Sequence, residues 1–337
     1  MPTSKTAERK TDILCISNFI LKGRIETETH EWEDMSIHIP KFCLRSGEIT
    51  AVIGGSGCGK SVFLSLLMGC PAFGIGGNVE ISRLCMFGKC VQGTAFRSVC
   101  AMANWRRQLQ DSGGLFYLPQ TFPVSKTQRI HVDVAMIQIV QALVAPVRKS
   151  VREVRAAIKA SFCEHRLEDA LKKNMSGLSG GERRRAELLA RVVAMKLARR
   201  PAILILDEPT TGFDPANAQQ FIRDVRIAID GLCRDGVVAC ALFSTHEMNC
   251  LDDKDEDGGR QVVDNICIIH RDAEGDGKGN CVVLFDGPTE NVWHRFYPNA
   301  KADKTFASDG ESLFETLKTK NTDEWLMSEP EEDNHVS

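Results

Sequence analysis

The residues with the clearest capacity for chemistry run from Gly54 to Ser61 and read Gly-Gly-Ser-Gly-Cys-Gly-Lys-Ser. Glycines in such a loop let successive backbone N–H groups point at phosphate oxygens, which larger side chains would block. Lys60 can reach the β- and γ-phosphates of a nucleotide, and the Ser61 hydroxyl can bind Mg²⁺. Apolar runs lie on both sides, at 49–53 and 62–67. This order of strand, glycine loop and helix predicts a nucleoside triphosphate site.

Three further apolar runs end in polar residues that could complete this site. These residues are Gln120 after run 115–118, Asp207 and Glu208 after run 202–206, and Ser244 to His246 after run 237–243. The second and third runs are apolar throughout, which is typical of parallel strands buried on both faces. Open α/β sheets bind ligands at the carboxyl ends of their strands, so we expect these polar groups to gather around the nucleotide.

The elements on either side of this set are predicted from shorter patterns. Strands are expected around 13–16 and 35–39, with Pro40 closing the second, and a small antiparallel sheet is expected within 78–98. Ser150 and Glu153 form a predicted capping box. The helix behind this box has an apolar stripe (Val151, Val154, Ile158 and Phe162) and a basic row (Arg148, Arg152, Arg155 and Lys159). The basic row is interpreted as a solvated face, with contact to an acidic partner or lipid headgroups as the alternative.

Composition narrows the function classes. The 337 residues are 43% hydrophobic, which is enough for a large core. The net charge of −3 gives no hint of a nucleic-acid partner. The start of the sequence has no apolar signal segment, and no run approaches the roughly 18 apolar residues of a membrane span. The 13 cysteines are scattered without a Cys-x-x-Cys pair. We therefore expect a soluble cytoplasmic protein with free thiols and neither disulfides nor zinc.

The stretch from Leu178 to Arg185 reads Leu-Ser-Gly-Gly-Glu-Arg-Arg-Arg and resembles the LSGGQ-type signature of ATP-binding cassette (ABC) ATPases. The order of motifs also matches that family: glycine loop, Gln120, signature, Asp207 with Glu208, Thr211 to Asp214, and His246. The resemblance covers about residues 10 to 290. The Gly-Glu-Arg-Arg-Arg form is similar to cassettes that serve bacterial lipid or amino-acid transporters.

The resemblance implies an α/β fold, with a P-loop NTPase core whose mixed sheet is largely parallel. An antiparallel β subdomain and an inserted α-helical subdomain at about 121–195 would complete a nucleotide-binding domain spanning 1–298. A polar, acidic extension would follow at 299–337. Two cassettes would pack head to tail, with ATP between the P-loop of one and the signature of the other. The start of the signature helix offers a second anion site, which is useful when it serves a neighbour's nucleotide.

The resemblance also implies a role for each motif residue. Glu208 is the expected general base, His246 the switch histidine at the γ-phosphate, and Gln120 the glutamine that senses the attacking water and Mg²⁺. The expected Mg²⁺ ligands are Ser61, Gln120 and Asp207, and Asp214 would act across the dimer. The residues expected to bind ATP are Gly54, Gly55, Ser56, Gly57, Cys58, Gly59, Lys60, Ser61 and Val62, with Ser179, Gly180 and Gly181 from the signature.

Two positions depart from the family pattern. Val62 stands where the family usually has Thr or Ser, so a side-chain contact with the α-phosphate is missing. The aromatic residue that normally stacks on adenine has no clear counterpart, and Phe19 and Trp32 are the candidates.

An acidic stretch from Asp253 to Gly258, with Asp264 at the twelfth position, has the ligand spacing of an EF-hand loop. Arg260 occupies a position that is usually apolar, Asp264 replaces the usual Glu, and a strand-like run follows. We therefore interpret the stretch as a solvated acidic loop rather than a Ca²⁺ site.

The leading hypothesis is the ATP-hydrolysing subunit of an ABC transporter, held at the inner face of a membrane by a separate transmembrane permease. It would work as a homodimer or with a second cassette. The alternative is a soluble ABC-type ATPase acting on nucleic acid or ribosomes, which lacks support from a long heptad region, a second cassette or a basic patch. A regulatory nucleotide switch without turnover is disfavoured because Glu208 is present.

Overall fold

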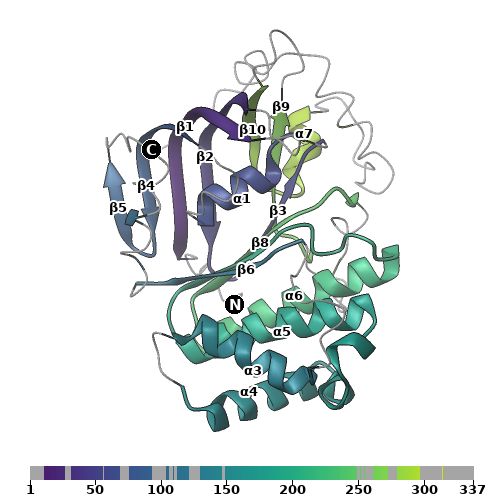
Figure 1. Cartoon of the computed structure of the whole chain (residues 1–337). Coiled ribbons are helices and arrows are strands. Elements are labelled where there is room, and N and C mark those ends of the chain that lie inside the picture. The colour runs from purple at the N-terminus through teal and green to yellow at the C-terminus, as the bar shows by residue number, and fades with distance from the viewer. Residues whose placement is uncertain are drawn as a thin grey trace, which may run out of the picture.

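In a computed structural model, ten strands of the described residues form one curled sheet (Figure 1). The structure describes residues 11–26, 32–55, 57–68, 76–92, 104–105, 109, 112–120, 130–145, 149–248, 251, 254, 261–271, 279–296 and 313. The strands are β1 (Asp12–Glu26), β2 (Trp32–Arg45), β3 (Ile49–Ile53), β4 (Gly76–Met86), β5 (Lys89–Gln92), β6 (Gly114–Leu118), β7 (Ala202–Leu206), β8 (Ala239–Ser244), β9 (Asn265–Arg271) and β10 (Gly279–Pro288). Their order in the sheet is β5-β4-β1-β2-β10-β9-β3-β8-β7-β6.

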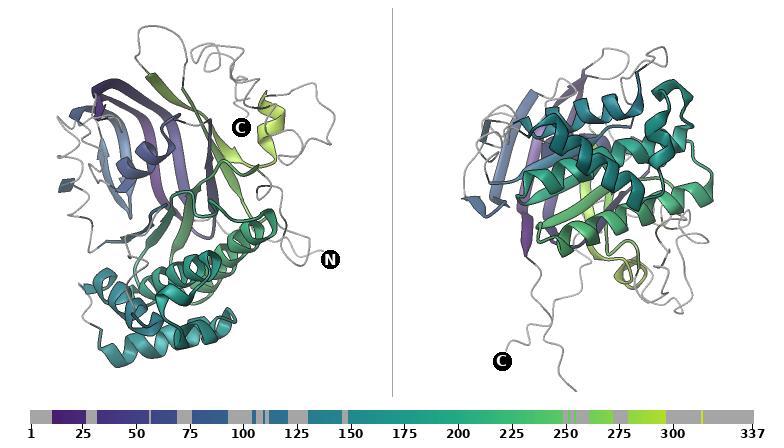
Figure 2. Two further views of the ribbon diagram at one scale, coloured as in Figure 1. Left: turned by 45° about the vertical axis from the view of Figure 1, so that its right-hand side comes forward. Right: turned by 90° about the horizontal axis from the view of Figure 1, so that it is seen from below.

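Helices cover the sheet on both sides. They are α1 (Lys60–Met68), α3 (Val132–Leu143), α4 (Val151–Glu164), α5 (Gly180–Ala198), α6 (Pro215–Arg234) and the short α7 (Asn291–Phe296). The curled part of the sheet wraps around α1, whereas α3 to α6 form a separate layer against the other side (Figure 2). The expected α/β fold, with a mixed sheet, an antiparallel part and a helical layer, is confirmed.

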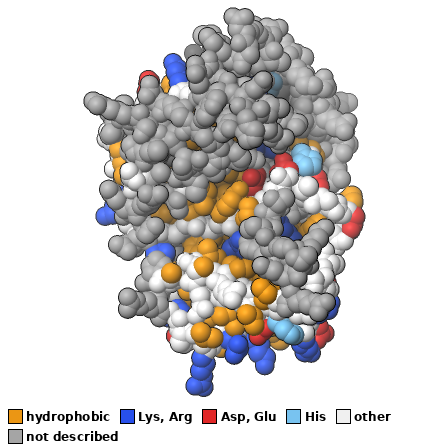
Figure 3. Space-filling model, in the orientation of Figure 1, with side chains coloured by type: hydrophobic (Ala, Val, Ile, Leu, Met, Phe, Trp, Pro, Cys, Tyr) orange, Lys and Arg blue, Asp and Glu red, His pale blue; other side chains and the backbone are white. Residues whose placement is uncertain are grey.

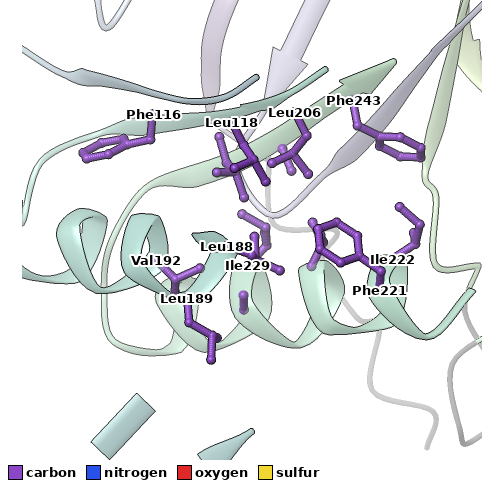
Figure 4. Packing of buried hydrophobic residues seen from close by; sticks show 14 of the residues in the cluster. Phe116, Leu118, Leu188, Leu189, Val192, Leu206, Phe221, Ile222, Ile229 and Phe243 are labelled. Carbon is purple, nitrogen blue, oxygen red and sulfur yellow. The ribbon is translucent and has the colours of Figure 1, made fainter. Parts of the chain in front are cut away.

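The strands β3, β8, β7 and β6 are neighbours and run parallel. Because side chains alternate along a strand, β7 contributes to two cores at once. Leu204 and Leu206 join the core on the α5 and α6 side, while Ile203 and Ile205 join the core around α1. Figure 4 shows the first of these cores, with Leu206 facing the helix side chains. The parallel arrangement brings the carboxyl ends of these four strands to one edge, as the sequence predicted.

The antiparallel part is formed by β2, β1, β4 and β5. The prediction that Pro40 ends its strand is wrong, because β2 continues to Arg45. Proline has no backbone N–H to donate to a neighbouring strand, but neither neighbour of β2 pairs with it at Pro40. The strand β10 pairs with β2 only at residues 35–38 of β2. In β1 the residue at this level is Asn18, which has φ 48° and lies between two paired positions.

The capping box at the start of α4 is confirmed, since the Ser150 hydroxyl accepts the Glu153 N–H and the Glu153 carboxylate accepts the Ser150 N–H. The predicted apolar stripe is correct for Val154, Ile158 and Phe162, which are buried. It is wrong for Val151, the first residue of the helix, which is 47% exposed. Lys and Arg side chains gather at the lower edge of the molecule near α4, as expected of a solvated face (Figure 3).

The expectation that the cysteines are all free thiols is wrong. Cys85 and Cys90 form a disulfide that joins β4 to β5. The two residues lie directly opposite each other in the β4–β5 hairpin. Strand pairing therefore brings the two sulfur atoms together, although the cysteines are five positions apart and do not form a Cys-x-x-Cys motif.

Asp264, the twelfth residue of the EF-hand spacing, is not available to a cation. Its Oδ2 accepts the Ile49 backbone N–H at 2.8 Å and pairs with the buried guanidinium of Arg226. Arg226 in turn donates to the carbonyls of Val262 and Gly47. The carboxylate therefore connects the start of β3 to α6, a structural role that the acidic spacing did not indicate.

Asp264→Ala is expected to lower the free energy of unfolding by about 3 kcal/mol, because it removes the less exposed of the two carboxylates beside the buried Arg226 cation and leaves only Asp230, which is 40% exposed. Asp12→Ala removes a carboxylate from an ion pair in which Asp12 and Arg45 are 59% and 43% exposed, and should cost less than about 1 kcal/mol. Urea unfolding of both variants measures the difference. Equal midpoints would contradict the role given to Asp264.

Several predictions fall outside the described residues. They concern Ser56, Arg148, Asp253, Asp255, the Trp32 side chain and, apart from Leu313, the extension at 299–337. Leu313 itself is buried in the core shared with α5 and α6. Within the described ranges, none of the helices combines the length and the apolar character that crossing a membrane requires.

Candidate functional site

The glycine loop leaves β3 at Gly54 and enters α1 at Lys60. A Cβ atom on Gly54 would lie 2.3 Å from the Ile269 carbonyl oxygen of β9, so only glycine fits this close approach. Gly57 and Gly59 adopt φ values of 73° and 97°, which side chains other than glycine rarely allow. The loop thus has the backbone conformation that a phosphate cradle needs.

Side chains of the loop point in different directions. Lys60 is 7% exposed, and its Nζ donates to the carbonyls of Gly54 and Gly55 at 3.0 and 3.2 Å. The side chains of Cys58 and Val62 are buried in the core around α1, so these two residues can meet a phosphate only through their backbones. The Lys60 ammonium group is therefore held at the glycine loop by two backbone carbonyls of that loop.

Asp207 follows β7 and lies against the start of α1. Its Oδ1 accepts hydrogen bonds from the hydroxyls of Ser61 at 3.2 Å and Ser244 at 2.7 Å, and its Oδ2 accepts one from Tyr117 at 3.2 Å. Adjacent ligands of an octahedral Mg²⁺ lie about 3 Å apart when metal–oxygen distances are about 2.1 Å. The Ser61 and Asp207 oxygens fit that spacing, so the pair is suited to hold Mg²⁺.

Glu208 is the centre of the remaining polar groups. Its Oε2 accepts the Gln120 amide at 2.8 Å and the Thr211 hydroxyl at 3.2 Å, and its Oε1 lies 3.6 Å from His246 Nδ1. The φ of Glu208 is 40°, a strained value that the Ser244 hydroxyl helps to hold by accepting the Glu208 N–H. The three residues predicted to be catalytic are thus brought together from the ends of three strands.

The signature residues begin α5. Ser179 is the N-cap, its hydroxyl accepts the Glu182 N–H, and the Glu182 carboxylate accepts the Ser179 N–H. The side chains of Ser179 and Glu182 therefore satisfy each other, while Gly180 and Gly181 start the helix with no side chain in front of its N-terminus. The helix runs on to Ala198. Asp214 caps α6 in the same way by accepting the Asn217 N–H.

Sequence reasoning missed two buried arginines that tie α5 to the site. Arg184 donates to the carbonyls of Pro119, Asp207 and Pro209, and Arg191 donates to that of Tyr117. Burial lowers the pKa of Arg191 to about 10. Their spacing of seven residues on one helix face, with apolar neighbours, was the available signal. These contacts connect the signature helix to the strand ends that carry Gln120 and Glu208.

Sequence reasoning also missed Tyr117 and Ser244, whose hydroxyls donate to Asp207. Ser244 was noted only as a polar residue at the end of its strand. One candidate is excluded: Phe19 is 2% exposed and belongs to the core around α1, so it cannot stack on adenine.

The sheet and the glycine loop between β3 and α1 have the form of the P-loop class of nucleotide-binding proteins. A family model described as "ABC transporter" matches residues 37–211, just over half of the chain, and the chain belongs to that family. The expected resemblance is confirmed.

Curated relatives agree with this assignment. The chain is 29% identical over 203 residues to a phosphate import ATP-binding protein, PstB 1, of Vibrio vulnificus, covering 57% of the chain and 64% of that protein. It is 28% identical over 193 residues to ATP-binding cassette sub-family G member 8 of Homo sapiens, covering 56% of the chain and 25% of that protein. The matches thus span less than two thirds of either relative.

Solved structures agree on the fold. An ATP-binding subunit of an ABC transporter matches with TM-score 0.51 and 17% identity, covering 88% of this chain and 99% of that one. A nucleotide-free ATP-binding cassette from an ABC transporter matches with TM-score 0.50 and 14% identity, covering 82% and 92%.

Proposed function

We propose that the chain binds ATP with Mg²⁺, hydrolyses it to ADP and phosphate, and drives a separate transmembrane partner. The observation that carries this proposal is the convergence of Lys60, Asp207, Glu208, Gln120 and His246 at the carboxyl edge of four adjacent parallel strands. Family membership supports the transporter setting. The alternative of a nucleic-acid or ribosome ATPase receives no support from the relatives reported above.

Each residue has a chemical task in this proposal. Lys60 and the loop N–H groups hold the β- and γ-phosphates, and Ser61 and Asp207 hold Mg²⁺, which neutralises charge on the phosphates when bound. Glu208 orients the attacking water and accepts its proton. Its Oε2 is held by Gln120 and Thr211, and its Oε1, which faces His246, is the oxygen that meets the water. Gln120 positions that carboxylate through the 2.8 Å hydrogen bond and could approach the cation when its amide turns.

The second half of the proposal concerns assembly. The helix start at Ser179 to Gly181 has unobstructed N–H groups, and an anion is stabilised at such a helix end. A phosphate already held by the loop of its own chain gains a second cradle when a neighbouring chain supplies one. We therefore propose a head-to-tail dimer in which each nucleotide lies between the glycine loop of one cassette and the signature of the other.

Mixing two inactive variants tests this arrangement. Ser179→Arg should leave ATP binding intact and prevent turnover, since its bulk and charge block the helix start. Combined with Lys60→Ala, it should restore about one working site per heterodimer, because one site then has an intact loop and an intact signature. ATPase activity across mixing ratios is the measurement. Absence of recovery in chains shown to exchange subunits would contradict the shared site.

The membrane partner is tested separately. We expect the tagged chain to co-purify with a multispanning membrane protein from detergent-solubilised membranes of its source cells. Lys60→Ala is the control for dependence on nucleotide. Recovery only with ribosomes or DNA would contradict the transporter assignment while leaving the ATPase proposal untouched.

A further inference from the structure

Four cysteines form a row across the antiparallel part of the sheet. The strand register places Cys43 of β2 opposite Cys15 of β1, Cys15 opposite Cys85 of β4, and Cys85 opposite Cys90 of β5. Residues directly opposite each other on neighbouring strands share a face of the sheet. The strands β2, β1, β4 and β5 lie side by side in Figure 1. One face of this sheet therefore carries a continuous line of sulfur atoms.

The row lies on the outer face, away from the core around α1. Residues flanking Cys15 in the strand, Leu14 and Ile16, are buried in that core, as are Phe42 and Leu44 on either side of Cys43. Cys15, Cys43 and Cys85 are partly exposed, and Cys90 is exposed. Small molecules dissolved in water can therefore reach these sulfur atoms.

The two halves of the row are in different redox states. Cys85 and Cys90 are joined by a disulfide, which shows that directly opposite cysteines on this face can be bridged. Cys15 and Cys43 are free thiols whose Sγ atoms are 2.9 Å apart. Since strand pairing already holds these two sulfur atoms together, a bond between them requires little movement of the backbone.

The environment of the pair favours a thiolate on Cys43. The hydrogen bond between the two sulfur atoms lowers the pKa of Cys43, and the positive charge of Arg45 acts in the same direction, against burial and the carboxylates of Asp286 and Asp12. The same hydrogen bond raises the pKa of Cys15. A thiolate next to a protonated thiol is the arrangement of a nucleophile with its resolving partner.

We propose that Cys43 and Cys15 form a thiol–disulfide exchange site whose substrates are low-molecular-weight disulfides. The Cys43 thiolate attacks one sulfur of the substrate, which forms a mixed disulfide and releases the first substrate thiolate. The Cys15 thiol then loses its proton to that leaving group and attacks Cys43 Sγ, which forms the Cys15–Cys43 bond and releases the second substrate thiolate. The protein is oxidised by two electrons, and the substrate is reduced to two thiols.

Glutathione disulfide is a suitable probe for the full chain purified without reductant. Incubation should remove the thiols of Cys15 and Cys43 together, and peptide mapping by mass spectrometry should find Cys15 linked to Cys43 with the Cys85–Cys90 bond unchanged. Cys163, an exposed thiol on α4, is the internal reference for ordinary surface reactivity. Thiol loss at Cys163 alone, a stable glutathione adduct on Cys43, or a bond from Cys15 to Cys85 would each overturn the assignment.

Two variants separate the roles within the pair. Cys15→Ser should stop at a glutathione adduct on Cys43, because the resolving thiol is gone. Cys43→Ser should leave Cys15 reduced, because the hydroxyl cannot start the exchange. Cys163→Ser is the matched control and should form the Cys15–Cys43 bond like the parent. An adduct on Cys15 in Cys43→Ser at the parental rate would show that Cys43 is not the nucleophile. Mapping of the parent decides the pairing even when a variant fails to fold.

Discussion

Replacing Glu208 with glutamine is expected to lower ATP turnover by about 10²–10⁴-fold while ATP still binds. The amide has nearly the same shape as the carboxylate. Its oxygen can therefore continue to accept the hydrogen bonds from the Gln120 amide and the Thr211 hydroxyl, which are 2.8 and 3.2 Å long in the parent. What the change removes is the negative charge and basicity that polarise the attacking water. Mg²⁺ binding should survive, because Asp207 and Ser61 are unchanged.

The same variant reports on assembly. With hydrolysis stalled, ATP should remain between two cassettes and hold them together. Gel filtration with ATP and Mg²⁺ should show a larger species for Glu208→Gln than for the parent, and ADP should not produce that species. An inactive variant that binds ATP and stays monomeric, also with its membrane partner present, would contradict the dimer but not the general base.

Glu247→Gln is the matched control for this experiment. Glu247 lies one residue beyond His246 and is half-buried, and burial raises its pKa. The change has the same chemistry at nearly the same place, but the proposed mechanism gives this carboxylate no task. Turnover close to the parental rate is expected. If Glu247→Gln loses activity as strongly as Glu208→Gln, the assignment of the base is wrong.

Replacing Lys60 with alanine is expected to weaken ATP binding by roughly 10²-fold or more, because charge-assisted hydrogen bonds to the β- and γ-phosphates contribute about 1.5–3 kcal/mol each. The structure places the ammonium group within 3.0 and 3.2 Å of two carbonyls of the loop, so the charge is already at the cradle. Equilibrium titration with a fluorescent ATP analogue measures the loss.

Two further variants keep this result interpretable. Lys60→Met retains the buried aliphatic stem and removes only the charge, so it should show the same loss of affinity with less effect on thermal unfolding. Lys89→Ala removes an exposed lysine on β5 and should bind ATP like the parent. Unchanged affinity in Lys60→Met would mean that the glycine loop is not the nucleotide site.

The sequence by itself determined the residues whose roles follow from local geometry. The glycine loop between β3 and α1, the capping box at Ser150, and the buried strands β7 and β8 depend on contacts within a few residues or on a local pattern of burial. Such features are readable because neighbouring residues impose them. The grouping of Gln120, Glu208 and His246 was predictable for a related reason, since parallel strands bring their carboxyl ends to one edge.

Only the tertiary structure decided which distant residues meet. Arg184 and Arg191 look like surface residues in the sequence, and it is the packing of α5 against β6 that buries them against the carbonyls at the strand ends. In the sequence Asp264 looks like part of an acidic loop. In the structure its carboxylate pairs with Arg226 and accepts the N–H of Ile49, the first residue of β3. Phe19 could be removed as an adenine contact only when its burial was known.

The cysteines show the physical reason most directly. The positions 15, 43, 85 and 90 have no regular spacing, and the sequence predicted scattered free thiols. Their alignment arises from the register of four strands, which is set by how apolar side chains on one face pack around α1. A shift of one residue in any strand would turn its cysteine toward the core and break the row. Register is a property of the whole sheet, so no local pattern in the sequence reveals it.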